Sequence, residues 1–260
     1  MIDKKMYQQV GLDEAFEGYK QSLTIDEDIN EIYNSIEIKM KKPDLLGKTL
    51  RVTERQFTEI HGIVNKLADK LEMSSPDVFV FEDFFYGIES FGMNEYWIEI
   101  SAKTIRDFSI KELEFLFARE MYKINYGVTY QSMLIEEYSK VYQSVPSIGG
   151  IINKVARNKF NHWYRLENYS ADNFAYLYCK DLRASISAIV AMVLNSKILL
   201  DQVDMGTFVE QASDITKLDD MVYNYTKADE VIPYAPMRVE SLLAYSISVR
   251  GMKARKEMEA

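Results

Sequence analysis

The stretch ELEFLFAREMYKINYG, residues 112–127, decides how this sequence is interpreted. Its apolar residues recur every three or four positions, which predicts an amphipathic helix. At the centre of that helix, Arg119 and Lys123 stand one turn apart, and Glu120 follows Arg119 directly. An ordinary helix can carry such charges on a solvated face, where they form weak salt bridges. These three residues therefore belong either to such a solvated face or to a site.

The spacing of the two cations is that of a metal-binding motif. In H-E-x-x-H, histidines at i and i+4 lie on one face of a helix and coordinate one zinc ion, and the glutamate activates the zinc-bound water. Here Arg119 and Lys123 stand where the motif has histidines, and only Glu120 matches it. An arginine does not deprotonate in a protein, and a lysine ammonium has no lone pair to offer a metal.

Composition limits the classes of protein that this chain can belong to. Of its 260 residues, 47% are hydrophobic and 27% are charged, as in soluble globular proteins. A net charge of −9 disfavours a general nucleic-acid binder, which needs a basic surface. The single cysteine excludes an internal disulfide, and two distant histidines exclude a histidine-rich centre. We therefore expect no metal, no cofactor and no nucleic-acid partner.

The apolar runs of the chain are short. The most apolar one, ISAIVAMVLNSKILL at residues 186–200, is interrupted by Asn195, Ser196 and Lys197, so it is too short to span a bilayer. The N-terminal residues have no apolar core of signal-peptide length. These features predict a cytoplasmic protein without a membrane span.

The chain divides into a charged N-terminal part and a longer remainder. Residues 1–45 are expected to form a helical extension, with a helix that ends at Pro43, and they offer a surface for an oligomer or a complex. Residues 46–260 are expected to form one domain. A helix with an apolar stripe follows near residue 57, and Thr53 with Gln56 resembles its capping box.

The remaining elements indicate an α+β fold. Residues 77–82 and 95–101 are β-branched, aromatic and alternating, which predicts two strands, and the Gly-containing segment 87–94 is expected to be a loop. Ser109 and Glu112 are placed to cap the central helix. After this helix the sequence is almost wholly helical, with a break expected near residues 160–165. One small sheet with many helices is an α+β plan.

Three separate stretches of the chain resemble the M48 family of zinc metallopeptidases, in the order that the family has them. They are LLGKTLRVTERQFTEIHGIVNKLADKLEMSSPDVFVF (45–81), KTIRDFSIKELEFLFAREMYKINYGVTY (103–130) and WYRLENYSADNFAYLYCKDLRASISAI (163–189). A fainter likeness extends to PYAPMRVESLL, residues 233–243. The resemblance implies a mostly helical, zincin-like metallopeptidase fold with a small antiparallel-edged sheet.

The same resemblance implies that the zinc ligands have been replaced. The two family histidines fall on Arg119 and Lys123, and the third ligand, a glutamate, falls on Asn168 because Asp172 matches the family's aspartate four residues later. Glu167 is one residue off and points about 100° around the helix, so it is a poor substitute. We expect no zinc, and a structural role for the cations in pairing with Asp172. Binding of an anionic group is the alternative.

The implied function is that of a pseudopeptidase, which is not expected to be an enzyme. It would bind a peptide or partner protein in the degenerate cleft, as an adaptor, chaperone or regulator, with Glu120 as the remnant of the general base. In the resembled family the substrate pairs with an edge strand. The matching residues here are Tyr96, Trp97, Ile98, Glu99, Ile100 and Ser101.

Two other functions stay open at this point. The first is a metal-independent enzyme that uses Glu120 as an acid or base and Lys123 as a nucleophile. The second is a purely structural subunit of an assembly, held through the helices of residues 1–45.

Overall fold

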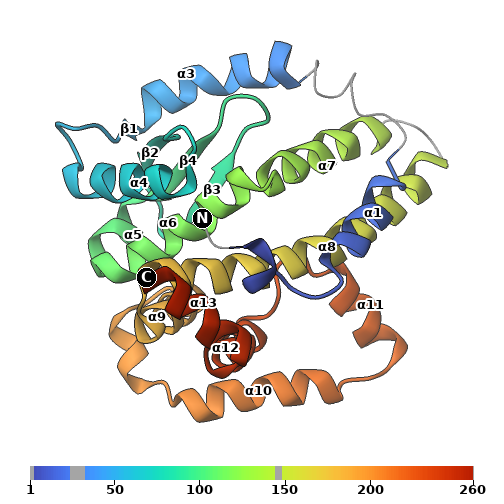
Figure 1. Cartoon of the computed structure of the whole chain (residues 1–260). Coiled ribbons are helices and arrows are strands. Elements are labelled where there is room, and N and C mark those ends of the chain that lie inside the picture. Colours follow the sequence, from blue (N-terminus) through green and yellow to red (C-terminus); the bar gives the residue numbers. More distant parts are fainter. Residues whose placement is uncertain (1–2, 24–32, 144–147, 260) are drawn as a thin grey trace. The chain divides into compact units, whose positions relative to one another are not determined.

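The computed structural model describes residues 3–23, 33–143 and 148–259. Within these residues the chain is mostly helical and has one four-stranded sheet (Figure 1). The predicted mostly helical α+β class is confirmed. The chain forms two compact units. Unit 1 contains Met1–Ala15, Phe108–Arg119 and Asn161–Ala260, and unit 2 contains Phe16–Asp107 and Glu120–Phe160.

The sheet lies in unit 2. Its strands are β1 (Leu50–Arg51), β2 (Asp77–Phe81), β3 (Ile88–Phe91) and β4 (Trp97–Ser101), in the order β1-β2-β4-β3. The central pair, β2 and β4, is parallel, while β1 pairs with β2 and β3 pairs with β4 in antiparallel fashion. The expectation of antiparallel edges is therefore confirmed.

The strand expected to bind a peptide is not an edge strand. The prediction named Tyr96, Trp97, Ile98, Glu99, Ile100 and Ser101, but β4 is paired on both sides, with β2 and with β3. The glycines of residues 87–94 favour a loop locally, and this preference conceals a strand. Gly87 and Gly92 instead flank β3, and Gly92, with φ 111°, makes the turn towards β4. The edge strand beside β4 is β3.

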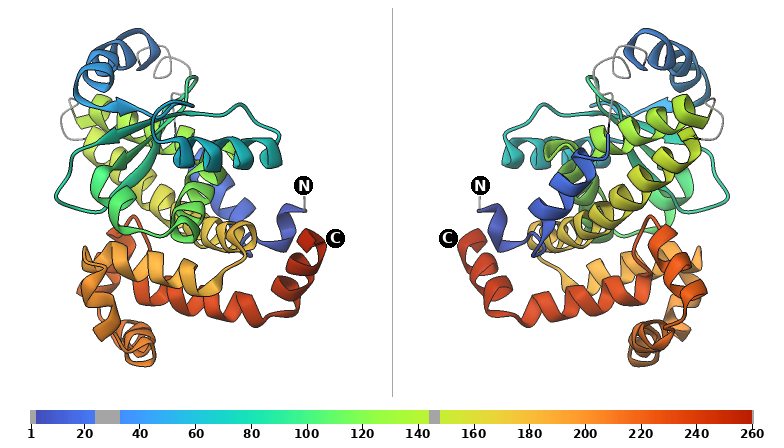
Figure 2. Two further views of the ribbon diagram at one scale, coloured as in Figure 1. Left: turned by 90° about the vertical axis from the view of Figure 1, so that its left-hand side faces the viewer. Right: turned by 90° about the vertical axis from the view of Figure 1, so that its right-hand side faces the viewer.

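The two faces of the sheet meet different helices. Phe79 and Trp97 form a small core with Leu45 of α3 (Ile38–Lys48). In Figures 1 and 2, α4 (Thr58–Leu71) lies on the opposite side of the sheet from α3. Helix α3 does not end at Pro43, as expected, but continues past it to Lys48. Pro43 is exposed, so the carbonyl that loses its backbone donor there can be hydrated.

The predicted apolar stripe begins at Phe57, which lies just before α4 and is only half-buried. Helix α4 buries the other members of that stripe, which are Ile60, Ile63, Val64, Leu67 and Leu71. Its start differs from the prediction, because α4 begins at Thr58, after Phe57 in a left-handed conformation with φ 55°. The Thr53 hydroxyl accepts the backbone N–H groups of Arg55 and Gln56, each at 3.3 Å. Thr53 therefore closes a turn before the helix and does not cap it.

In the described part of the chain, three helices have residues in both units: α1 (Leu12–Lys20), α6 (Ile110–Asn125) and α8 (Ile148–Cys179). The expected break near residues 160–165 is wrong. That segment contains neither Gly nor Pro, and α8 passes through it without interruption. The chain turns at Lys180, which has φ 58°, and Asp181 caps the next helix by accepting the N–H of Ala184 at 2.9 Å.

The other elements belong to one unit each. Unit 2 also contains η2 (Tyr33–Glu37), α5 (Ala102–Asp107) and α7 (Val128–Gln143). Unit 1 contains η1 (Lys4–Met6), α9 (Leu182–Leu194), η3 (Ile198–Gln202), α10 (Met205–Lys217), α11 (Met221–Asp229), α12 (Ala235–Ile247) and α13 (Val249–Glu259). Helix α12 packs against α9, α10 and α13, and η1 contacts α13.

The first described residues are part of the core of unit 1. Tyr7 is fully buried, with its ring 5.3 Å from that of Phe174. Asn173 donates a hydrogen bond to the carbonyl of Tyr7 at 3.0 Å, and the Tyr245 hydroxyl donates one to Met6 at 2.9 Å. The boundary at residue 45 stays a prediction, and residues 24–32 of the expected N-terminal helices lie outside the described part of the chain.

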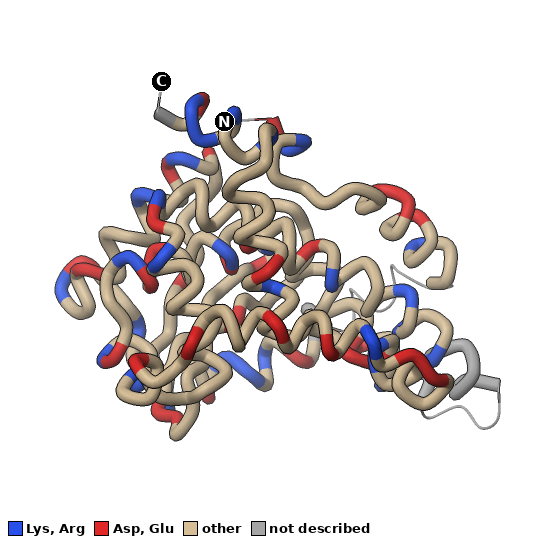
Figure 3. Tube along the Cα trace, turned by 90° about the horizontal axis from the view of Figure 1, so that it is seen from below, with Lys and Arg blue, Asp and Glu red and all other residues tan. Residues whose placement is uncertain are grey.

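Acidic and basic residues are interspersed along the trace (Figure 3). None of the helices in the described ranges is long and apolar enough to cross a membrane.

Candidate functional site

Helix α6 carries the charged residues in a buried setting. At its start, the Ser109 N–H and hydroxyl donate to Glu112 at 2.8 and 2.9 Å, which forms the predicted capping box. Residues on several sides of α6 are buried, and they include Leu113, Phe115, Leu116, Phe117, Ala118, Met121 and Tyr122. Arg119 and Lys123 are themselves only 7% and 6% exposed. The solvated-face interpretation of this motif is therefore wrong.

Asp172 binds two arginines in unit 1. Its Oδ1 lies 2.6 Å from Nε of Arg119, and Arg238 of α12 donates from Nε to Oδ2 and from Nη2 to Oδ1, each at 2.8 Å. Burial alone would raise the pKa of Asp172, but the Arg238 and Arg119 guanidinium groups outweigh it and hold that pKa below its ordinary value. Asp172 is therefore ionised at neutral pH.

Asn168 completes this group, which we call the Asp172 cluster: Arg119, Asn168, Asp172 and Arg238. Asn168 lies one turn before Asp172 on α8. Its Oδ1 accepts Nη2 of Arg119 at 3.0 Å, and its Nδ2 donates to the carbonyl of Tyr164 at 2.8 Å. The positions implied for one histidine ligand and for the glutamate ligand are thus joined directly by a hydrogen bond.

A second group, in unit 2, surrounds Glu120. Its Oε1 lies 2.8 Å from Nζ of Lys123, and its Oε2 accepts both the backbone N–H and the hydroxyl of Ser90, at 3.0 and 2.9 Å. The Ser90 hydroxyl also lies 2.7 Å from that of Thr129. We call Glu120, Lys123, Ser90 and Thr129 the Glu120 cluster. Both carboxylate oxygens at the general-base position are therefore hydrogen-bonded within the protein.

Ser90 connects this cluster to the edge of the sheet. In an antiparallel ladder, alternate residues direct their N–H and C=O groups towards the partner strand. The Ser101 N–H donates to the carbonyl of Gly87, so Gly87, Glu89 and Phe91 face β4. Ile88 and Ser90 then face outwards, and the outward N–H of Ser90 is the one that Glu120 accepts. Glu120 thus occupies one donor on the side of β3 that faces away from β4.

The residues expected at the site fall into these two clusters. Arg119, Asn168 and Asp172 come together in unit 1, and Glu120 and Lys123 come together in unit 2. Of the two cations expected to pair with Asp172, Arg119 does so. Glu167 is buried on α8, beside Asn168 in the sequence.

Three members of the clusters were not identified from the sequence. Arg238 lies in the stretch PYAPMRVESLL, whose fainter likeness to the family was the available signal. Ser90 lies in β3, whose glycine-flanked sequence predicts a loop, and Thr129 has no local signal that separates it from other helical threonines. Each of them contacts a residue distant in the sequence.

The side chains do not fit the zinc ion that the resemblance implies. A guanidinium and an ammonium stand at the two histidine positions, and an amide stands at the third. Among the residues that the structure describes, no three His, Cys, Asp or Glu side chains are grouped so that they could hold a metal ion. The two clusters therefore consist of ion pairs and hydrogen bonds.

A sequence match indicates a distant M48-metallopeptidase-like relationship, and the mostly helical α+β fold is consistent with it. The chain is 24% identical over 186 residues to the plastoglobule-localized metallopeptidase 48 of the Arabidopsis thaliana chloroplast. The matched region covers 66% of this chain and 51% of that protein, so the chain spans about half the length of this relative. No protein-family model matches the sequence, and no solved structure matches it.

Proposed function

We propose that this protein is a catalytically inactive, M48-like pseudopeptidase that binds a peptide or partner protein. The observation that carries the proposal is the burial of Arg119 and Lys123, each within an ion pair, at the positions of the histidine ligands. Fixed positive charges at these positions repel Zn²⁺ at short range. Without the metal, no bound water is activated for hydrolysis.

The geometry around Glu120 also disfavours the metal-independent enzyme. A lysine acts as a nucleophile only after it loses its proton. A carboxylate at hydrogen-bonding distance stabilises the protonated ammonium, and Glu120 lies 2.8 Å from Lys123. Glu120 in turn accepts hydrogen bonds from Ser90 and Lys123, so its oxygens are engaged in holding the fold.

The purified protein is expected to contain far less than one zinc ion per chain and to leave unfolded casein uncleaved, because two of the three ligand positions carry cations and the third carries an amide. Elemental analysis of protein prepared without chelator, and gel electrophoresis after prolonged incubation with casein, provide the measurements. A Glu120→Gln variant serves as the control and should behave as the wild type does. Stoichiometric zinc, or cleavage that the Glu120→Gln change abolishes, would refute the pseudopeptidase assignment.

The binding role is assigned to the outer side of β3, since β4 is inside the sheet. An extended peptide can add to an exposed sheet edge through backbone hydrogen bonds. On β3, Ile88 directs its backbone groups outwards, away from β4, and its side chain is only half-buried. Ile88 is therefore the residue through which such a peptide would pair.

An Ile88→Pro variant is expected to lose peptide binding by about tenfold or more, because proline removes the outward donor without removing a bond to β4. Unfolded casein, immobilised for interferometry, is a suitable extended probe. The matched control is Ile88→Ala, which shortens the same side chain but keeps its N–H and should retain most of the binding. Circular dichroism verifies that both variants are folded.

Equal binding by wild type and Ile88→Pro, or no binding by the wild type, would count against this edge. The structural-subunit alternative then gains support if the full chain forms a stable oligomer, measured by analytical ultracentrifugation, while casein binding is absent.

A further inference from the structure

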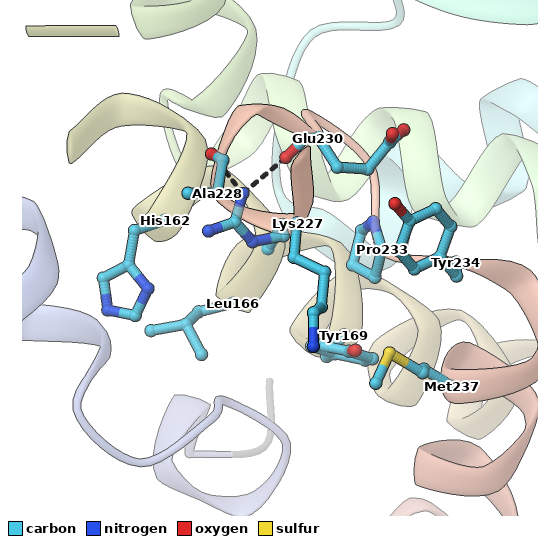
Figure 4. Close-up of a pocket in the computed structure, with 10 residues that line it drawn as sticks. His162, Leu166, Tyr169, Lys227, Ala228, Glu230, Pro233, Tyr234 and Met237 are labelled. Carbon is cyan, nitrogen blue, oxygen red and sulfur yellow. Dashed lines mark hydrogen bonds between the residues drawn. The ribbon is translucent and has the colours of Figure 1, made fainter. Parts of the chain in front are cut away.

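Unit 1 contains a pocket that belongs to neither cluster (Figure 4). Its volume is about 310 Å³, at the small end of the range of roughly 300–1,000 Å³ that is usual for ligand sites. It is lined by α8, by the end of α11, by the segment that follows α11 and by the first turn of α12. A pocket of this size takes a molecule with one ring or one large side chain.

One face of α8 forms a wall of the pocket. His162, Arg165, Leu166 and Tyr169 line it, and their spacing of i, i+3, i+4 and i+7 places them on the same side of the helix. The other residues used below come from the opposite wall: Lys227, Glu230 and Met237. The pocket thus combines cations with apolar and aromatic side chains.

The two cations of the pocket are bound to neutral groups. Arg165, which is half-buried, donates from one nitrogen to the carbonyls of Ala228 (3.2 Å) and Glu230, drawn as dashed lines in Figure 4. Lys227 donates to carbonyls at the end of α10. Within the described ranges, neither Arg165 nor Lys227 forms an ion pair with a carboxylate.

Burial of a cation is unfavourable unless it is paired, and burial lowers the pKa of Arg165 although the charge of Glu230 acts in the opposite direction. Glu230 is the acidic residue of the lining, but Figure 4 shows its side chain directed away from His162 and Leu166. The lining therefore carries more positive than negative charge, on a chain whose net charge is −9. An anionic group in the pocket would supply the missing counter-charge.

The other side chains that line the pocket indicate which chemical group should be attached to that anion. Leu166 and Met237 offer aliphatic surface, and Tyr169 offers a ring. Burial raises the pKa of Tyr169, so its phenol stays protonated and can donate a hydrogen bond. A phosphate or sulfate alone would leave this apolar surface unused.

We propose that this pocket binds a small organic carboxylate with an apolar or aromatic body. The carboxylate is held by Arg165 and Lys227, and the body packs on Leu166, Met237 and Tyr169. Such a group occurs in free organic acids and at the C-terminal residue of a peptide. The proposal goes beyond the pseudopeptidase function and does not depend on it.

Isothermal titration with N-acetyl-L-phenylalanine and its amide tests the proposal, because the two probes differ only in the charge of the terminal group. The acid is expected to bind at least about tenfold more tightly than the amide, as charge-assisted hydrogen bonds imply. Arg165→Met should weaken binding of the acid by about tenfold or more. Arg183→Met, which removes an exposed arginine of α9, is the matched control and should leave binding unchanged.

A second variant separates binding from folding, because Arg165 also holds carbonyl groups at the end of α11. Leu166→Trp keeps both cations but fills the pocket, and it should abolish binding of the acid. Equal affinity for acid and amide, no binding at millimolar concentration, or unchanged binding by folded Arg165→Met or Leu166→Trp would each overturn the proposal.

A peptide that ends in phenylalanine distinguishes the two sources of the ligand. If it binds as tightly as the free acid, the pocket receives a peptide C-terminus. If only the free acid binds, the pocket receives a small molecule. Either result supports a carboxylate site.

Discussion

Replacement of Asp172 by alanine is expected to lower the free energy of unfolding by about 3–5 kcal/mol, the usual cost of removing one partner from a buried ion pair. Asp172 is 1% exposed and is bound by Arg119 and Arg238. Its removal leaves two buried guanidinium groups without the carboxylate that they share. The measurement is urea unfolding of the wild type and the variant, followed by circular dichroism.

A surface pair provides the control. Asp214 and Lys217 form an ion pair on α10 in which the two side chains are 73% and 70% exposed. Asp214→Ala should therefore change stability by about 0–1 kcal/mol. If Asp172→Ala costs no more than Asp214→Ala does, the Asp172 cluster does not hold unit 1 together.

The contribution of Asp172 has a defined pH dependence. Its pKa in the folded protein lies below the ordinary value of 3.8, because two arginines stabilise the ionised form. Stability from a lowered carboxyl pKa is fully present above the unfolded-state pKa and is lost as pH falls through the folded-state pKa. The difference between wild type and Asp172→Ala should therefore be constant from neutral pH to about pH 5 and should shrink below about pH 4.

The sequence was informative where structure is set by local pattern. Helical periodicity identified the central helix, and its capping box formed as Ser109 and Glu112 predicted. Strands β2 and β4 were visible as alternating β-branched and aromatic blocks. Strand β3 is only four residues long and is flanked by glycines, so local chemistry favoured a loop.

The order of the strands in the sheet could not be predicted from local sequence pattern. Strand β4 pairs in parallel with β2 and in antiparallel fashion with β3, and these pairings join segments that local propensity treats separately. A strand inside the sheet and a strand at its edge can have the same alternation. The alternation of β4 therefore suggested an edge strand, whereas the edge of the sheet on that side is β3.

The partners within the two clusters could not be predicted from local sequence either. The spacing of Arg119 and Lys123 was enough to select them, because a helix fixes which residues share a face. Their partners are set by tertiary structure: Arg238 is 66 residues from Asp172, and Ser90 is 30 residues from Glu120. A buried cation requires a charged or hydrogen-bonding partner, but the local sequence does not show which segment of the chain supplies that partner.

Substitutions at Glu120 are expected to separate a structural role from a catalytic one. Glu120→Ala should lower the free energy of unfolding by about 3–5 kcal/mol, because Lys123 is buried and loses its 2.8 Å partner. The N–H and hydroxyl of Ser90 lose their acceptor as well. Glu120→Gln keeps a carbonyl oxygen that can accept from Ser90 but removes the charge, so its cost should be smaller, about 1–3 kcal/mol.

Glu114→Ala, on the same helix, provides the matched control. Glu114 pairs with Lys111 at 2.6 Å, but the lysine is 51% exposed, so the loss should be about 0–1 kcal/mol. In a peptidase, the general base accepts a proton during the reaction and so increases its rate. Removing a general base therefore abolishes hydrolysis, but it need not lower the stability of the fold. Here the free energy of unfolding should instead increase in the order Glu120→Ala, Glu120→Gln, wild type. A stable Glu120→Ala protein would contradict the structural role, because the contacts with Lys123 and Ser90 would then contribute nothing to the fold.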